Sequence, residues 1–315
     1  MVSITNNTPL QNLCKPIKWQ ENLARLDGAY ADSTLRAYRT DIRTFVSWCE
    51  ASGLTPFPAS VETMAAFIAY EAKRSSVSTI KRRLAALRKI HRLLSFDSPG
   101  QDEEVNIALR RTFRLKRTRQ RQAMGLTREL REQLISSCPN TLSGIRDGAI
   151  ISIGYDTLCR RSELVGLRIE DLTLSTRGSG QILIRRSKND QNGSGRIGYV
   201  SQRSLKLLEI WLSAARIDHG YIFRSIHHDK ISANPLAPYS INRILKQAAS
   251  RSNFNSRQVE VISGHSLRVG AAQDLMTRGA DILSIMRAGG WKTMNVVARY
   301  VENSAIEKFM DNFNE

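Results

Sequence analysis

The sequence predicts a mainly α-helical protein of two domains, with a small β-hairpin in the second domain. Three observations lead to this fold class. Apolar residues recur at helical spacing through most of the chain, and a basic stretch with few apolar residues, 114–126, separates two such regions. Only residues 181–201 change to the shorter period that is typical of strands. The chain has 315 residues, of which 41% are hydrophobic, and this is enough for two ordinary domains with apolar cores.

The first predicted domain, residues 19–113, consists of helices. Its clearest helix has Ser33 or Thr34 as the N-cap, apolar residues at helical spacing, and Gly53 as its stop. Residues 1–18 lack strong periodicity and contain two prolines, so we expect a flexible N-terminal arm. Helices are expected at about 33–52, 60–73, 76–95 and 102–112.

The second predicted domain, residues 127–303, is mostly helical. Two strand-like stretches, 181–188 and 197–201, flank the turn-forming sequence NDQNGSGR and predict a hairpin. The stretch 220–235 is interpreted as a polar loop, and an apolar stripe over 304–315 predicts a C-terminal helix. Helices are expected at about 127–138, 144–157, 204–215, 239–250, 266–279, 282–289 and 294–303.

The charge balance indicates a polyanionic partner. The chain has 47 Lys and Arg against 29 Asp and Glu, a net charge of +18 and a pI near 10.2. Such a surplus favours nucleic acid, with an anionic membrane surface as the alternative. The sequence shows no apolar run long enough to span a bilayer and no signal-peptide pattern at its start, so we expect a cytoplasmic protein. Four dispersed cysteines without a C-x-x-C pair argue against a zinc knuckle or a disulfide scaffold.

The positive charge is concentrated between Lys73 and Arg121, which hold 15 basic and 4 acidic residues. The predicted helix at 76–95 and the linker are basic together, and this favours contacts with backbone phosphates over a merely solvated face. We expect base readout from that helix and from the helix around Tyr239–Gln247. The candidate DNA-binding residues are Lys81, Arg82, Arg83, Arg88, Lys89, Lys116, Arg117, Arg119 and Arg121.

A set of polar residues in otherwise apolar stretches of the second domain suits phosphate chemistry. Direct attack on a phosphodiester needs a nucleophile, donors for the non-bridging oxygens and a proton source for the leaving oxygen. Arginine's planar fork fits phosphate oxygens. The sequence has no phosphate-binding G-x-x-x-x-G-K-[ST] loop and no obvious carboxylate cluster for Mg²⁺, so we favour a protein nucleophile and expect no cofactor. The set comprises Arg160, Arg161 and Glu163 in TLCRRSELVGL, Lys188, His265 and Arg268 in GHSLRVGAA, and Trp291 and Tyr300 in GGWKTMNVVARYVEN.

The order R…K…H-x-x-R…W…Y resembles the tyrosine recombinase, or phage integrase, family. The stretches SGHSLRVGAA and IMRAGGWKTMNVVARY are similar to the C-terminal part of its Cre-like members. This resemblance implies the DNA breaking-rejoining fold, with 19–113 as the core-binding domain and 127–303 as the catalytic domain. It also implies a site-specific recombinase that cleaves and rejoins DNA through a 3′-phosphotyrosine and a Holliday junction, without metal or ATP.

The resemblance also implies roles for the first half of the motif. The family pattern T-G-L-R-x-S-E-L, aligned on S-E-L, makes Arg160 the first catalytic arginine, although a slip of one residue would put Arg161 there. Glu163 matches a supporting acidic residue that positions rather than reacts. Lys188 matches the hairpin lysine that protonates the leaving 5′ oxygen.

For the second half, the resemblance implies that Tyr300 attacks the phosphorus and that His265 assists proton transfer at this tyrosine. Arg268 would hold the scissile phosphate. Trp291 stands where many members have a second histidine, and its indole N–H can still donate to a phosphate oxygen.

The family pattern further implies partners. Two subunits would bind an inverted-repeat site on double-stranded DNA, and two sites would pair as a tetramer in which the helix at 304–315 docks on a neighbouring subunit. A type IB topoisomerase, which shares the nucleophile, and a DNA-binding regulator without catalysis are the alternatives. The target site, its spacer and individual base contacts are not predicted.

Overall fold

The mainly α-helical fold class is confirmed. The computed structural model describes residues 18–116, 122–185, 195–228, 230–300 and 302, and the chain divides into two compact units, Met1–Gln120 and Arg121–Glu315. The division falls within the linker predicted at 114–126, although the helix that precedes it continues to Leu115. The predicted arm at 1–18 lies outside the described residues except for Lys18. The C-terminal helix predicted at 304–315 lies wholly outside them.

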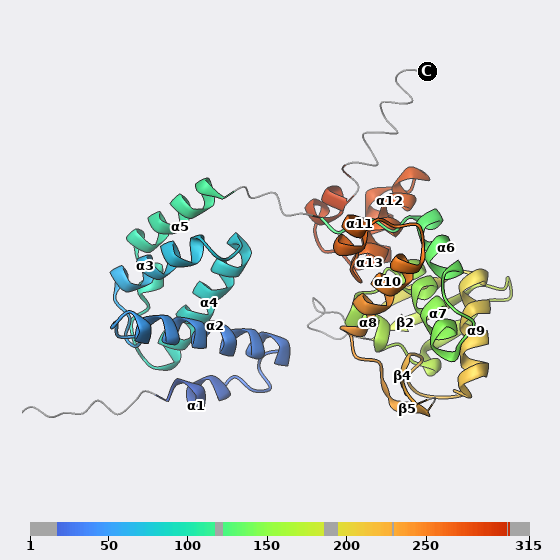
Figure 1. Cartoon of the computed structure of the whole chain (residues 1–315), viewed down its shortest axis with the longest axis horizontal. Helices are drawn as coiled ribbons and strands as arrows, with labels where there is room; N and C mark the ends of the chain where they lie inside the picture. Colours follow the sequence, from blue (N-terminus) through green and yellow to red (C-terminus); the bar gives the residue numbers. More distant parts are fainter. Residues whose placement is uncertain (1–17, 117–121, 186–194, 229, 301, 303–315) are drawn as a thin grey trace, which may run out of the picture. The chain divides into compact units, whose positions relative to one another are not determined.

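The first unit is a group of helices around one core (Figure 1). Ile42, Phe45 and Leu87 are fully buried because the apolar faces of the two longest helices meet at the centre. The first helix was not predicted, since its six residues bury only Trp19 and Leu23 and are too short to show a period. The helices are α1 (Trp19–Ala24), α2 (Asp32–Ala51), α3 (Val61–Ala72), α4 (Val77–Leu93), η1 (Pro99–Gln101) and α5 (Glu103–Leu115).

The second unit is built around α7 (Leu142–Asp156), a helix that is buried on nearly all sides. Its residues Ile150 and Ile151 are fully buried, and helices from both ends of the unit pack against it. The other helices are α6 (Arg128–Ser136), α8 (Arg161–Val165), η2 (Ile169–Asp171), α9 (Gln202–Ala215), α10 (Ser240–Arg251), α11 (Ser256–Val261), α12 (Ser266–Thr277) and α13 (Ile282–Gly289). Residues 294–300 are also helical.

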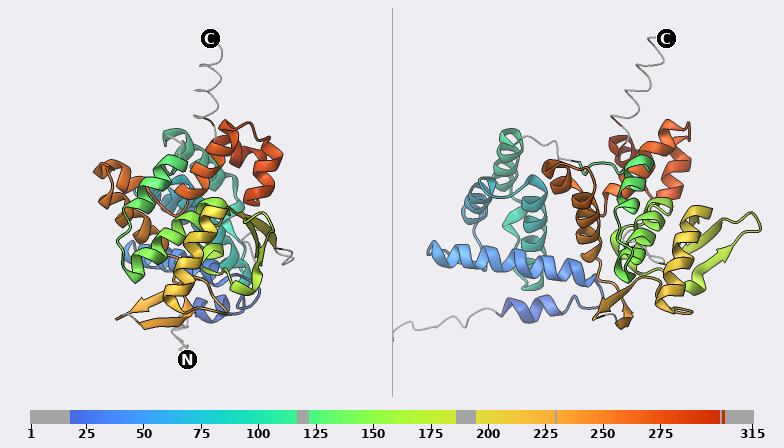
Figure 2. Two further views of the ribbon diagram at one scale, coloured as in Figure 1. Left: turned by 90° about the vertical axis from the view of Figure 1, so that its right-hand side faces the viewer. Right: turned by 45° about the vertical axis from the view of Figure 1, so that its right-hand side comes forward.

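Two small antiparallel sheets complete this unit. The first has the order β1 (Leu172–Leu174), β2 (Gly180–Ile184), β3 (Arg196–Val200), and it lies beside α9 (Figure 2). The second pairs β4 (Arg224–His227) with β5 (Lys230–Pro235).

The strands correct two predictions. The polar loop predicted at 220–235 contains β4 and β5, which sequence reasoning missed because the side chains of both strands are half-buried or exposed and do not alternate. The predicted hairpin has a third strand, β1, and its first predicted strand ends at Ile184 rather than at residue 188. None of the helices that the structure describes is long and apolar enough to cross a membrane.

Candidate active site

Six of the eight residues in the predicted set lie in one chain of contacts. Glu163 joins Arg160 to Arg268, and Arg268 stacks on Trp291. The Trp291 ring lies beside Tyr300, which in turn contacts His265. Of the other two, Lys188 lies outside the described residues, and Arg161 is exposed. The residues come from the start of α8, the start of α12, the segment after α13 and the helical residues 294–300.

Glu163 organises the start of α8. Its carboxylate accepts a hydrogen bond from the backbone N–H of Arg160 at 2.9 Å. It also forms an ion pair with the Arg160 Nη1 at 2.6 Å. Its side chain is 1% exposed because α8 packs into the core through Leu164. Burial alone would raise the pKa of Glu163, but the hydrogen bonds and charge of Arg160 outweigh this and hold the pKa below its ordinary value. Glu163 is therefore a carboxylate at neutral pH.

Arg268 is a fully buried guanidinium. Its Nη1 donates to the Leu158 carbonyl, its Nη2 donates to the Gly289 carbonyl at 2.9 Å, and its Cζ lies 4.5 Å from the centre of the Trp291 ring. Burial, and then the charge of Arg160, lowers its pKa to about 10, so it stays charged at neutral pH. Among the described residues, the nearest carboxylate oxygen, on Glu163, lies 4.0 Å away. A charge held this way is positioned mainly by backbone carbonyls and by an aromatic face.

Steric constraints explain why two glycines, Gly289 and Gly290, precede Trp291. A Cβ on Gly289 would overlap the Trp291 ring, and Gly290 has a φ of +63° that disfavours other residues. The chain can therefore leave α13 and turn back so that the indole lies under Arg268.

Tyr300 and His265 form a hydrogen-bonded pair. The His265 Nε2 lies 2.7 Å from the Tyr300 hydroxyl, and the Trp291 and Tyr300 ring centres are 5.7 Å apart. Burial, reinforced by the charges of Arg268, Arg160 and nearby Arg161, lowers the pKa of His265 to about 4, so it is neutral at pH 7. Burial also raises the pKa of Tyr300, even though arginine charges oppose this. The phenol therefore keeps its proton at neutral pH, and a neutral imidazole lies where it can accept that proton.

The two neighbouring arginines of the CRRSE sequence face different surroundings. Arg160 is half-buried and paired with Glu163, whereas Arg161 is exposed and its side chain runs over Gly264, where a Cβ would overlap it. The alignment on S-E-L thus selects the arginine that the fold ties to Glu163.

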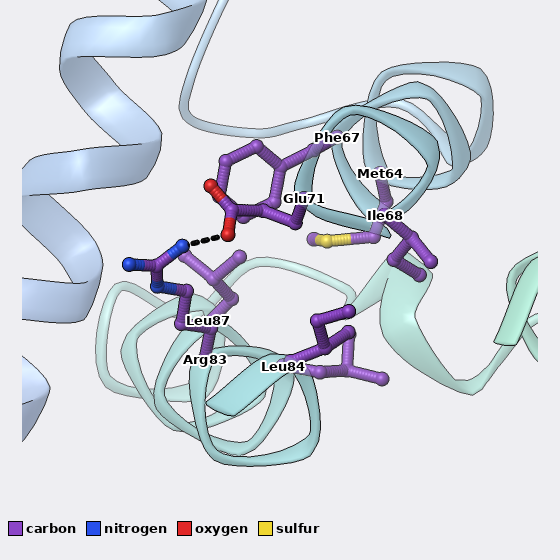
Figure 3. Close-up of a pocket in the computed structure, with 8 residues that line it drawn as sticks. Met64, Phe67, Ile68, Glu71, Arg83, Leu84 and Leu87 are labelled. Atoms are coloured by element: carbon purple, nitrogen blue, oxygen red, sulfur yellow. Dashed lines mark ion pairs between the residues drawn. The ribbon is translucent and has the colours of Figure 1, made fainter. Parts of the chain in front are cut away.

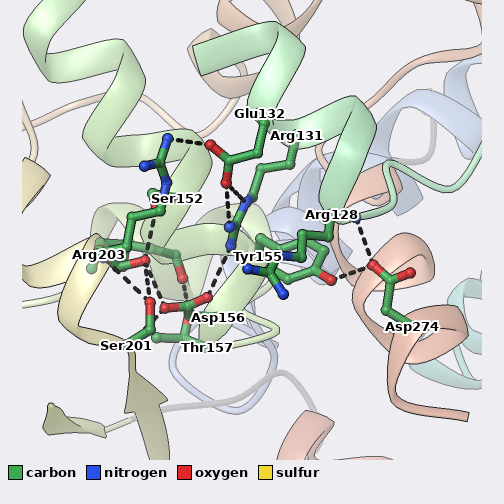
Figure 4. A network of polar contacts seen from close by, with 12 residues as sticks. Arg128, Arg131, Glu132, Ser152, Tyr155, Asp156, Thr157, Ser201, Arg203 and Asp274 are labelled. Atoms are coloured by element: carbon green, nitrogen blue, oxygen red, sulfur yellow. Dashed lines mark hydrogen bonds and ion pairs between the residues drawn. The ribbon is translucent and has the colours of Figure 1, made fainter. Parts of the chain in front are cut away.

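A polar network behind these residues fixes the position of α12 (Figure 4). Asp274, on α12, accepts hydrogen bonds from the Tyr155 hydroxyl and, at 2.6 Å, from the backbone N–H of Arg128. Asp156, the last residue of α7, pairs with Arg131 of α6 at 3.2 Å. The helix α12, of which His265 is the N-cap, is therefore bound to both α6 and α7.

The predicted DNA-binding residues of α4 make several contacts within the first unit. Arg82 pairs with Asp41 at 2.7 Å, and Arg83 pairs with Glu71 of α3 beside a small apolar cavity (Figure 3). The Arg88 Nε donates to the Gly100 carbonyl at 2.7 Å. Donors that are used in this way are not available to a base edge.

The remaining candidates are placed as follows. Lys81 lies 4.6 Å from the centre of the Phe113 ring, and Lys89 lies 5.3 Å from that of Tyr30. Lys116 donates to the Ser75 carbonyl. On α10, the exposed side chains include Arg243 and Gln247, and Tyr239 is exposed just before this helix. Arg117, Arg119 and Arg121 lie outside the described residues.

Sequence reasoning missed one residue that touches the site. Arg196, at the start of β3, lies 3.3 Å from Glu163 through its Nη2, and its side chain is 11% exposed. Its only signal in the sequence is its place at the end of the predicted hairpin turn, among several other arginines.

Comparisons with known proteins show what the chain is similar to. Residues 125–307 match the model of the phage integrase family, and residues 18–95 match that of the phage integrase N-terminal SAM-like domain. An integrase/recombinase XerD homologue of Selenomonas ruminantium is 34% identical over 299 residues, covering 91% of this chain and 86% of its own. Recombinase Cre of Escherichia phage P1 is 28% identical over 292 residues, covering 87% and 85%. A structure of the Tn1549 transposon integrase in complex with transposon right end DNA shares the fold, with a TM-score of 0.64 and 13% identity over 93% of this chain and 98% of that one.

Proposed function

The chain belongs to the phage integrase family of tyrosine recombinases, and on this premise we propose that it is a site-specific DNA recombinase with Tyr300 as its nucleophile. The observation that carries the proposal is the 2.7 Å contact between the Tyr300 hydroxyl and a neutral His265, next to the buried guanidinium of Arg268. A protonated phenol, a base and a fixed cation are the parts that attack on a phosphodiester requires.

The proposed cleavage step runs as follows. The Tyr300 oxygen attacks the phosphorus as its proton passes to the His265 Nε2, while Arg160 and Arg268 stabilise the charge on the non-bridging oxygens. The bond to the 5′ oxygen breaks, and that oxygen takes its proton from Lys188. Trp291 donates its indole N–H to the same phosphate. The products are a 3′-phosphotyrosine and a free 5′ hydroxyl.

Rejoining needs no external energy source, because the phosphotyrosine bond retains the energy of the phosphodiester. A 5′ hydroxyl from a second duplex attacks the phosphotyrosine, and exchange of one strand pair leaves a Holliday junction that the second exchange resolves. We propose a dimer on each inverted-repeat site and a tetramer of two paired sites, with 304–315 as the docking segment between subunits.

Contacts with the duplex are proposed for both units. The net charge of +18 and the fold shared with an integrase solved on DNA support a DNA partner. In the first unit, the exposed Lys81 and the residues of the basic linker would contact phosphates. Arg82, Arg83 and Arg88, whose donors are used within the unit, would hold α4 in place. In the second unit, Arg243 and Gln247 of α10 would read base edges.

The test is a covalent-adduct assay. Wild-type protein and a Tyr300→Phe variant are incubated with a library of genomic fragments, denatured and separated on a gel, and the captured ends are sequenced. We expect site-specific adducts from the wild type, none from Tyr300→Phe, and similar DNA affinity for both. Tyr199→Phe, on an exposed strand position, is the matched control and should form adducts normally.

Three other outcomes would contradict the proposal. An adduct that persists in Tyr300→Phe removes this residue as the nucleophile. Relaxation of any supercoiled plasmid, regardless of its sequence, indicates a type IB topoisomerase. Specific binding without an adduct from the wild type indicates a regulator.

A further inference from the structure

Arg196 uses its guanidinium to join three parts of the second unit. The Nη1 donates to the Thr157 carbonyl at 2.9 Å and to the Ala288 carbonyl at 2.7 Å. The Nη2 donates to the Leu158 carbonyl at 3.2 Å and lies 3.3 Å from the Glu163 Oε2. One side chain on β3 therefore contacts the end of α7, the end of α13 and the carboxylate at the start of α8.

Arg196 and Arg268 share this platform. The Leu158 carbonyl accepts from both arginines, and the Ala288 and Gly289 carbonyls accept from Arg196 and Arg268 respectively. These carbonyls lie at or just beyond the C-terminal ends of α7 and α13. The last carbonyls of a helix lack partners within the helix and carry partial negative charge, so they attract cations. The two guanidinium groups thus lie between two helix ends that favour them.

We propose that Arg196 is a positioning residue of the recombinase site, which fixes Glu163 and the ends of α7 and α13 and thereby sets the orientation of Arg160 and Arg268. This inference rests on the proposed function. Arg196 itself does not contact the phosphate in this proposal, because its two Nη atoms make four contacts with oxygen atoms and so use all four of their hydrogens, whereas Arg268 makes one hydrogen bond through each Nη. Gly290 also packs against the Arg196 side chain. A Cβ on Gly290 would lie 2.9 Å from the Arg196 Cδ.

The geometry requires arginine at this position. The four oxygen acceptors lie on three different segments, and a planar fork with donors on two nitrogens reaches all of them. A lysine places its three donors on one atom and cannot span that set. Arg196→Lys therefore keeps the positive charge but loses the connection between Glu163 and the helix ends.

The experiment measures single-turnover cleavage on a nicked suicide duplex of the mapped target, from which the short 5′-hydroxyl strand diffuses away so that the adduct accumulates. Arg196→Lys should bind this duplex within about threefold of wild type, yet form the adduct about 100-fold more slowly, since a misplacement of about 1 Å costs about that factor. The matched control is Arg185→Lys on the same hairpin. Arg185 is 55% exposed and pairs only with Asp171 among the described residues, so its variant should cleave at the wild-type rate.

A double-variant cycle separates positioning from a general loss of stability. Because Arg196 acts through Glu163, the two substitutions should not have independent effects. The cleavage rate of the Arg196→Lys/Glu163→Gln double variant should lie within about threefold of that of the slower single variant. If the two effects were independent, the rate losses of the single variants would multiply in the double variant. Thermal unfolding of each variant is measured in parallel. If Arg196→Lys does not fold, Arg196→Gln, which keeps an N–H donor for the carbonyls, replaces it in the cycle.

The outcomes are distinct. Wild-type cleavage rates in Arg196→Lys, or multiplicative losses in the double variant, overturn the assignment of Arg196 and leave Tyr300 as the nucleophile. A wild-type protein that forms no adduct with any fragment overturns the proposed function and the positioning role with it.

Discussion

The two units of this chain each contain a cluster of arginines, and the clusters differ in their charge balance. In the first unit, Arg82 and Arg83 face two carboxylates, Asp41 and Glu71. Figure 3 shows the pair of Arg83 and Glu71. In the second unit, three guanidinium groups surround a single carboxylate within the described residues. These are Arg160, Arg196 and Arg268 around Glu163.

The difference indicates what each cluster is for. A cluster with equal numbers of the two charges is complete, and it holds α2, α3 and α4 together. A cluster with an excess of buried positive charge is costly unless other groups compensate it. Backbone carbonyls at helix ends supply part of that compensation here, and the phosphate of the proposed substrate would supply the rest. Arginine counts alone would not distinguish the two clusters.

The largest expected effect is on the rate of cleavage, for which the two clusters should differ most. Arg268→Lys should reduce the rate of adduct formation by about 10²–10³-fold, because the donors aimed at the developing phosphate charge are lost. Arg83→Lys, the matched change in the balanced cluster, should change that rate less than about threefold. Single-turnover cleavage at saturating protein measures both. Equal losses in the two variants would mean that the clusters do not differ in function.

A smaller effect concerns stability and its pH dependence. Glu163→Gln leaves three guanidinium groups without their carboxylate and should lower the free energy of unfolding by about 3 kcal/mol. Asp41→Asn should lower it by about 1.5 kcal/mol, because Arg83 keeps Glu71 and Arg82, at 47% exposed, can turn to solvent. Urea unfolding at pH 7 measures both differences.

The pH dependence follows from the lowered pKa of Glu163. Its stabilising contribution is fully present above the unfolded-state value of 4.5 and is lost as the pH falls through the lower folded-state pKa. The difference in stability between wild type and Glu163→Gln should therefore shrink as the pH falls below about 4.5. A difference that stayed constant down to pH 2 would contradict the ionised state of Glu163.

The smallest effect compares one histidine from each unit. Burial lowers the pKa of His265, with arginine charges adding to it, to about 4, and burial also lowers that of His91. Adding the target duplex should raise the pKa of His265, because a phosphate favours the imidazolium, and should leave that of His91 unchanged. Histidine ¹³C–¹H titration with and without DNA measures this, and a His265→Gln variant assigns the signal. If the pKa of His265 did not change on addition of DNA, His265 would not lie next to the bound phosphate.

The long helices could be predicted from the sequence, because the apolar period that marks them is local, as in α4. The site residues were predicted from the family resemblance, and the structure connects the H-x-x-R pair to the tyrosine after G-G-W through the contact between His265 and Tyr300. The availability of Arg82 and Arg83 could not be predicted in this way. Their partners, Asp41 and Glu71, lie on other helices, and only the fold brings them opposite α4.

The short strands and the role of Arg196 could not be predicted from the sequence, for related reasons. Strands β4 and β5 pair through their backbones while their side chains stay half-buried or exposed, so no alternation marks them. Arg196 makes its contacts mostly with carbonyl groups, which every residue has and no sequence motif records.

Arg196 and Arg268 are held mainly by main-chain carbonyl groups, and this affects which residues can change in related sequences. An acceptor that belongs to the peptide bond does not depend on the side chain of its own residue, so the hydrogen bonds of Arg196 set no direct demand on the side chains at 157 and 288. The next two positions have no such freedom. Gly289 leaves no room for a methyl group beside the indole, and Gly290 has a φ of +63°. Among distant descendants, the pair of glycines should persist while the residue before it drifts.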